Sequence, residues 1–240
     1  MGQKVHPTGF RMGITEDWRS KWYAPKAAFS EFLIEDQRIR SLIEKLLNRT
    51  PPFAGCSGTW IERTRNEVKV TLETARPGMV IGPKGAEVDK LREALEELID
   101  RKVSVNIKEV KNPDLNARLI ALDIGEQLKK RGSFRRVMKM HCEATMSAGA
   151  LGVKILCKGR LGGAEMSRRE TQKLGSIPLQ TLRANVDYGF AQSFTTYGTL
   201  GVKVWVYKGE YGSEVPDEVD ESRRPRGRGP SRRGERDKRE

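Results

Sequence analysis

The chain has few of the residues on which catalysis and metal binding usually depend. Only two of its 240 residues are histidines, and its three cysteines, Cys56, Cys142 and Cys157, lie far apart in the sequence. Scattered cysteines in odd number favour neither a disulfide framework nor a metal cluster. The sequence also has no Gly-Lys-Ser/Thr loop, no His-Glu-x-x-His and no Gly-x-Ser-x-Gly motif. We therefore expect no catalytic site, no metal, no cofactor and no small-molecule substrate.

Long apolar runs are missing as well. No stretch approaches the length that crosses a membrane, and no basic-then-apolar leader precedes the first helical pattern. These absences predict a reduced, cytoplasmic, soluble protein with no membrane partner.

What the chain has in excess is positive charge. It contains 45 lysines and arginines against 32 aspartates and glutamates, for a net charge of +13. Such an excess is typical of proteins that bind a polyanion, either nucleic acid or an acidic membrane face. Residues 213–240 contain 9 basic and 8 acidic side chains, so residues 1–212 keep a net charge of +12. We expect the affinity for polyanions to lie in the folded part of the chain.

The C-terminal residues differ in composition from the rest. Residues 213–240 are rich in Arg, Gly and Pro and have almost no apolar side chain to bury, which predicts a disordered tail. Two interpretations are equally open for this tail: a solubilising extension, or an arm that touches RNA without sequence preference.

The first half of the chain predicts a basic arm followed by a folded domain. Residues 1–25 are basic, rich in Gly, Pro and Trp, and show little periodicity. Helical spacing begins near Ala27, and we expect one face of this helix to carry Phe29, Phe32, Leu33, Ile39, Ile43, Leu46 and Leu47. Strands are predicted at about 59–65, 67–74 and 103–108, the last two from alternating apolar residues.

Between the second and third of these strands lies the loop Gly82-Pro83-Lys84-Gly85, which opens an amphipathic helix. Two glycines around a two-residue tip let the backbone approach a phosphodiester chain, and the start of the helix offers N–H groups to the phosphates. A GxxG loop in this setting is the nucleotide clamp of KH domains, whereas alone it would indicate an ordinary turn. The order helix, strand, strand, GxxG, helix, strand predicts a type II KH domain over residues 26–111.

The second half of the chain predicts another α+β domain, over residues 112–212. Two helical patterns, at 115–128 and 134–148, are each followed by glycine. After them the apolar residues recur at every second position, at 151–157 and again at 202–206. This order predicts a helix pair packed on an antiparallel sheet.

The second helix of this pair carries three cations on one side. Arg135 and Arg136 lie four and three residues before Lys139, so all three project away from the apolar stripe that contains His141. Clustered cations repel one another, which favours a role in binding phosphates. The alternative is a solvated helix face. Such a face would normally include acidic residues among the cations, and the nearest acidic residue here is Glu143. We interpret His141 as a core histidine.

Other residues suit contact with RNA. Three arginines flank the glycine pair at 162–163 and would fan out from a turn: Arg160, Arg168 and Arg169. In the arm, His6 fits an RNA or partner contact. Three aromatic residues among the cations of the arm fit either base stacking or anchoring of the arm on the fold: Trp18, Trp22 and Tyr23.

With these segments in place, the chain resembles the family of the third protein of the bacterial small ribosomal subunit. The resemblance covers Met1 to about Gly212. It is carried by motifs in the family's order: GQKVHP at 2–7, VIGPKG at 80–85, FRRVMK at 134–139, GRLGGAE at 159–165, TLRANVDY at 181–188, and TYG with GVKVW at 196–205.

The resemblance implies that the protein binds 16S ribosomal RNA and neighbouring proteins in the head of the subunit, and that it helps line the channel by which mRNA enters. In the family, the positions of Arg135, Arg136 and Lys139 contact incoming mRNA and support its unwinding, here without nucleotide hydrolysis. Pro83 stands where the family often has a basic residue, which leaves the clamp one cation fewer. Further RNA-contact candidates in or near the motifs are Lys4, His6, Arg11 and Arg183.

We therefore expect a structural, RNA-binding ribosomal protein. One alternative is a free-standing KH regulator of mRNA or of ribosome assembly. A second, a nuclease or RNA-modifying accessory, is disfavoured because the sequence lacks clustered metal-binding carboxylates and histidines.

Overall fold

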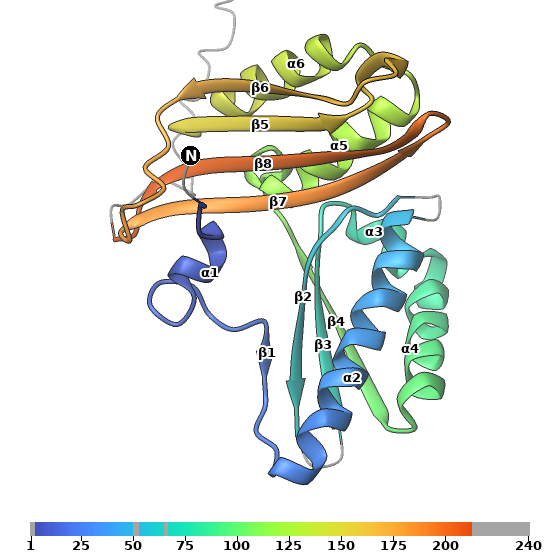
Figure 1. The fold of residues 1–240 in the computed structure, drawn as a ribbon. Helices are drawn as coiled ribbons and strands as arrows, with labels where there is room; N and C mark the ends of the chain where they lie inside the picture. Colours follow the sequence, from blue (N-terminus) through green and yellow to red (C-terminus); the bar gives the residue numbers. More distant parts are fainter. Residues whose placement is uncertain (1–2, 50–52, 65–66, 213–240) are drawn as a thin grey trace, which may run out of the picture.

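The computed structural model describes residues 3–49, 53–64 and 67–212 and contains two four-stranded sheets, each with helices packed against it (Figure 1). The predicted tail, residues 213–240, lies outside the described residues. An α+β fold with two successive domains is confirmed, and the domain limits given above stay predictions. None of the helices among the described residues is both long and apolar enough to span a membrane.

The first sheet has the strand order β1-β2-β3-β4. Strand β2 (Cys56–Arg63) is antiparallel to β3 (Glu67–Thr74), and β3 is parallel to β4 (Lys102–Glu109). A parallel pair requires a long crossover, which here contains α3 (Pro77–Ile81), the GxxG loop and α4 (Ala86–Ile99). The predicted type II KH topology is confirmed, and the crossover places the GxxG loop between two helices.

Helix α2 (Lys26–Ile43) packs on this sheet only along its second half. A π-helical turn at 44–49 follows it, and the residues that enter the core are Ile39, Ile43 and Leu47. The expectation that one apolar face would be buried along the whole helix is wrong at three residues, which are exposed: Phe29, Leu33 and Leu46. At the start of α2, Phe29 packs against Trp22 of the arm instead of the sheet, with ring centres 5.3 Å apart.

The second sheet has the strand order β6-β5-β8-β7 and is antiparallel throughout. Its strands are β5 (Gly152–Gly159), β6 (Arg168–Gly175), β7 (Ala184–Thr195) and β8 (Gly198–Glu210). Helices α5 (Ala117–Lys129) and α6 (Phe134–Ser147) lie on one face, behind the sheet in Figure 1. The period-two pattern explains the packing, because Val153, Ile155 and Cys157 all point into the core beneath these helices.

The N-terminal arm is anchored on both domains. Its short helix α1 (Pro7–Arg11) contacts β7 of the second sheet, and β1 (Ser20–Lys21) pairs in parallel with β2 of the first. Figure 1 shows this path from one sheet to the other. Trp22 anchors the arm through an indole N–H donated to Asp36 Oδ2 at 2.9 Å, whereas Trp18 and Tyr23 are exposed.

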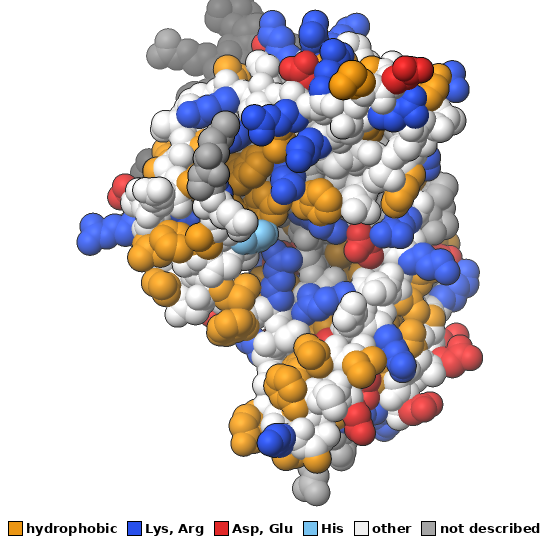
Figure 2. All heavy atoms as spheres, in the orientation of Figure 1, with side chains coloured by type: hydrophobic (Ala, Val, Ile, Leu, Met, Phe, Trp, Pro, Cys, Tyr) orange, Lys and Arg blue, Asp and Glu red, His pale blue; other side chains and the backbone are white. Residues whose placement is uncertain are grey.

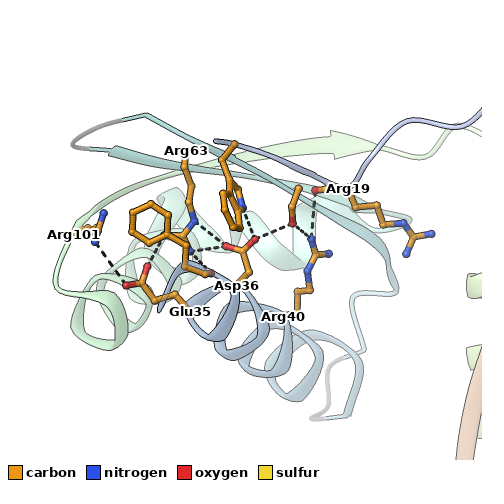
Figure 3. Close-up of polar contacts among 9 residues, drawn as sticks. Arg19, Glu35, Asp36, Arg40, Arg63 and Arg101 are labelled. Carbon is orange, nitrogen blue, oxygen red and sulfur yellow. Dashed lines mark hydrogen bonds and ion pairs between the residues drawn. The ribbon is translucent and has the colours of Figure 1, made fainter. Parts of the chain in front are cut away.

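Buried charges hold the arm on the KH domain (Figure 3). Asp36 of α2 is almost fully buried and accepts hydrogen bonds from Ser20 Oγ and from Arg63 Nε, both at 2.9 Å. Arg63 also pairs with Glu35, and Arg40 donates to Ser20 Oγ at 2.7 Å. A buried carboxylate is tolerated only when it is paired and hydrogen-bonded, so this cluster fixes the arm against α2 and β2.

One arginine joins the two domains. Arg118 of α5 donates from Nη1 to the carbonyl oxygen of Phe190 at 2.7 Å, and its Nη2 lies 3.2 Å from Glu44 Oε1 after α2.

The three cysteines are free and buried, and burial raises the pKa of Cys142 to about 11 and that of Cys157 to about 12. They are therefore core residues, with little thiolate at neutral pH.

Candidate nucleic-acid interface

The GxxG loop is held in a conformation that depends on its first glycine. Gly82 has φ 67° and ψ 179°, a region that essentially only glycine adopts. A Cβ at this position would lie 2.5 Å from Glu87 Cγ. Lys84 and Gly85 also have positive φ, and Pro83 and Lys84 are exposed at the tip. The backbone of the loop is thus turned outward between α3 and α4.

The start of α4 is open to an anion but is not strongly positive. Gly85 is its N-cap, and no side chain caps the first turn. Glu87 lies in that turn, although it pairs with Lys90 at 2.9 Å. The cation of the loop itself is Lys84, and the nearby apolar side chains of Met79 and Ile81 are exposed. A clamp for single-stranded RNA uses backbone N–H groups, a cation and exposed apolar side chains, and this loop presents all three.

The three predicted cations of α6 all reach solvent. Arg135, Arg136 and Lys139 are exposed, on the side of α6 opposite the buried residues of the helix. Two of them have distant acidic partners: Arg135 lies 4.0 Å from Glu170, and Lys139 lies 3.7 Å from Glu143. Arg136 has no ion pair among the described residues. Exposed pairs of this length contribute little, so all three cations stay available to a phosphate.

Arg168 joins this group through an aromatic ring. The guanidinium carbons of Arg135 and Arg168 lie 5.6 and 5.5 Å from the centre of the Phe134 ring, which gathers both side chains at the start of α6. Sequence reasoning selected Arg168 as part of a turn and did not connect it with α6. Antiparallel pairing of β5 with β6 makes the connection, because it brings Arg168 opposite Gly159 on the face that α6 covers.

Two of the predicted RNA-binding arginines have internal roles. Arg11 is fully buried, and its guanidinium donates to carbonyl oxygens that include Ala184 at 2.8 Å and Thr181 at 2.9 Å. The expectation of RNA contact at Arg11 is wrong, because no part of the side chain reaches the surface. Arg160 is half-buried and donates to the carbonyl oxygens of Ala164 at 2.9 Å and Tyr197 at 3.1 Å, which ties two loops together.

The remaining candidates lie at the surface. Lys4 and Arg183 are exposed. His6 Nδ1 accepts a hydrogen bond from the Gly9 N–H at 3.3 Å, and the ring packs edge-on against Tyr188. The pKa of His6 is lowered chiefly by burial, and also by the charges of Arg19 and Lys203. RNA contact at Lys4, His6 and Arg183 stays a prediction.

His141 lies in the core, as its place in the apolar stripe indicated. It is buried, with Nε2 at 3.2 Å from Asp123 Oδ2 and 3.1 Å from the Gln127 amide nitrogen. Burial lowers its pKa although Asp123 acts in the opposite direction. Among the described residues, no three histidine, cysteine or acidic side chains are grouped so that they could hold a metal ion.

Sequence reasoning missed a second group of cations, on the face of the second sheet away from α5 and α6. The residues that the strand pairing brings together there are Lys154, Lys158, Lys173 and Lys203. They come from three strands, β5, β6 and β8, so only the register between these strands reveals the group.

Comparison with known proteins agrees with this geometry. Residues 38–115 match the family model described as KH domain, and residues 124–206 match that described as Ribosomal protein S3, C-terminal domain. The chain is 53% identical over 210 residues to the small ribosomal subunit protein uS3 of Finegoldia magna, covering 88% of this chain and 84% of that protein. The protein of the same name from Rhodopirellula baltica is 50% identical over 215 residues, covering 89% and 91%. That of Carboxydothermus hydrogenoformans is 49% identical over 218 residues, covering 91% and 96%.

The chain belongs to the uS3 family of the small ribosomal subunit. The resemblance carried by its motifs is confirmed. Membership makes the chain a structural, RNA-binding component of the ribosome in the cytoplasm, and not an enzyme.

Proposed function

We propose that this chain binds 16S rRNA and neighbouring proteins in the head of the small subunit and lines the channel by which mRNA enters. There, Arg135, Arg136 and Lys139 of α6 hold incoming mRNA and assist its unwinding without nucleotide hydrolysis. The observation that supports this role is the exposure of all three cations on one side of a helix whose other side is fixed in the core.

A rigid row of cations suits an mRNA that must move. Contacts to phosphates carry no sequence information, so they bind every message alike and permit sliding along the strand. A strand held by its phosphates is hindered from pairing again with its complement, which favours the open form of a hairpin arriving at the site. Arg168 adds a fourth cation to this surface through its contact with Phe134.

The GxxG loop supplies a second contact, to single-stranded RNA. Its exposed tip, its uncapped helix start and the apolar side chains of Met79 and Ile81 support this role. With one cation in the loop, affinity there depends mainly on close approach of the backbone, which Gly82 and Gly85 permit.

Ribosomes that carry Arg135→Ala, Arg136→Ala and Lys139→Ala together test the grip on mRNA. Translation is timed on two messages that differ only in a stable hairpin downstream of the start. We expect a larger slowing on the hairpin message, with normal incorporation of the variant into subunits, because the buried side of α6 is unchanged.

The matched control removes three exposed lysines that have acidic partners, Lys21, Lys69 and Lys108. It changes the net charge equally and should not slow the hairpin message selectively. Equal slowing of the triple variant on both messages, or none on either, would contradict the proposed grip.

A further inference from the structure

The outward side of the second sheet collects cations from three strands. On β5, Val153, Ile155 and Cys157 point into the core, so the residues between them point outward. Pairing places Lys154 opposite Lys173 of β6, and Lys158 opposite Arg169. On the other side of β5, Lys203 of β8 lies opposite Leu156. Figure 2 shows Lys and Arg side chains gathered over this part of the sheet, with hydrophobic side chains between them.

This surface, the outer face, consists of Lys154, Lys158, Arg169, Lys173 and Lys203, with Lys4 of the arm beside it. None of these six residues has an ion pair among the described residues. The outward positions within 154–158, 169–173 and 201–205 include no aspartate or glutamate. The cations of α6 differ in this respect, because Arg135 and Lys139 have acidic neighbours.

Contacts within the outer face hold its positive side chains close together. Lys154 lies with its Nζ 5.2 Å from the centre of the Trp205 ring, which packs in turn against Tyr188 at 5.4 Å. Burial, with the charges of Lys4 and Lys173, lowers the pKa of Lys154. Like charges held close together without acids reduce stability unless a polyanion neutralises them.

We propose that the outer face is a separate binding surface for the phosphate backbone of ribosomal RNA. Lys154 lies over the Trp205 ring, so the chemistry presented to a partner there is positive charge, which fits phosphates better than stacked bases. Strand spacing spreads the charges over a grid about 10 Å wide and 13 Å long, which fits several phosphates of one polynucleotide. The surface is distinct from the mRNA-binding site proposed on α6, because α6 covers the opposite face of the sheet.

The full-length chain with Lys154→Gln, Lys158→Gln, Lys173→Gln and Lys203→Gln tests this assignment. Its binding to transcribed 16S rRNA is measured between 50 and 200 mM salt, without mRNA. If four phosphate contacts are lost, the plot of log affinity against log salt becomes shallower by about 3, and affinity at low salt falls by about tenfold or more. The control replaces four exposed lysines that have acidic partners: Lys21, Lys69, Lys108 and Lys130.

A slope equal to that of the control would overturn the proposal and would leave an acidic protein as the partner of this face. A second measurement needs no variant: the lysines of the native chain are acetylated with and without 16S rRNA and identified by mass spectrometry. We expect Lys154, Lys158, Lys173 and Lys203 to be protected by RNA, and their full reactivity in the complex would equally overturn the proposal. Neither result depends on whether α6 holds mRNA, so the two proposals fail separately.

Discussion

Arg168 and Arg169 are consecutive residues of β6 whose side chains lie on opposite faces of the second sheet. Arg168 contacts the Phe134 ring beside α6, and Arg169 lies opposite Lys158 on the outer face. The alternation of a β-strand thus divides one basic segment between two surfaces. On our proposals, the first surface meets mRNA and the second meets ribosomal RNA.

This division predicts different effects for two neighbouring substitutions of equal charge. Arg169→Gln should make the salt dependence of 16S rRNA binding shallower by about 0.7 to 0.9, the effect of one phosphate contact, while Arg168→Gln should leave it unchanged. In ribosomes, only Arg168→Gln should slow translation selectively through a hairpin. Identical behaviour of the two variants in both assays would show that the faces are not functionally separate.

The GxxG loop allows a test with two side chains of the same shape. Gly85 has φ 83° with no atom within 4 Å of an added Cβ, and Asp and Asn tolerate this left-handed conformation better than most residues. Gly85→Asp should weaken binding of single-stranded RNA several-fold more than Gly85→Asn, because only the carboxylate repels phosphate. Equal affinities, measured by fluorescence anisotropy with the full chain, would mean that the loop does not meet the RNA backbone.

Arg11 should matter for stability and not for RNA. Arg11→Ala would remove the guanidinium that donates to the carbonyl oxygens of Thr181 and Ala184 and would open a cavity, so we expect a loss of about 3 kcal/mol or more in the free energy of unfolding by urea. The exposed Arg183→Ala should change stability by no more than about 0.5 kcal/mol. A stable Arg11→Ala protein with weakened RNA affinity would reverse this assignment.

Both histidines should titrate below their ordinary value of 6.5, chiefly because of burial. The unfolded chain then binds protons before the folded chain does, so the free energy of unfolding should fall as the pH drops through 6.5 towards the folded pKa values. NMR titration can measure each pKa directly, since His6→Gln assigns the only two histidine signals. A pKa above 6.5 for His141 would mean that Asp123 outweighs burial.

The sequence predicted those elements whose pattern is decided locally. Strand β3 and helices α5 and α6 have regular apolar periods and are confirmed. Strand β6 is not evident from the sequence, because it is an edge strand with a polar outward side and few apolar residues. Helix α3 was not expected, since Pro77-Gly78 is typical of a turn. The exposed Phe29 was misplaced because helical spacing identifies a face but not what covers it.

The candidate binding sites also differ in whether local sequence patterns reveal them. The α6 cations lie within one turn of helix, so spacing alone could group them. The outer face needs the register between Lys154, Lys173 and Lys203, which local sequence does not contain. The burial of Arg11 depends on carbonyl oxygens about 170 residues away in the chain, a contact that no local pattern indicates.

The most direct test of the account is to map where each RNA touches the second domain. Ribosomes stalled on an mRNA with photoreactive uridines downstream of the decoding position are irradiated, and the crosslinked peptides of this chain are identified. We predict mRNA crosslinks to the α6 peptide that contains Arg135, Arg136 and Lys139, and none to peptides that contain Lys154 or Lys203. Crosslinks of mRNA to the outer face, or their absence from α6, would contradict the assignment of mRNA to this helix.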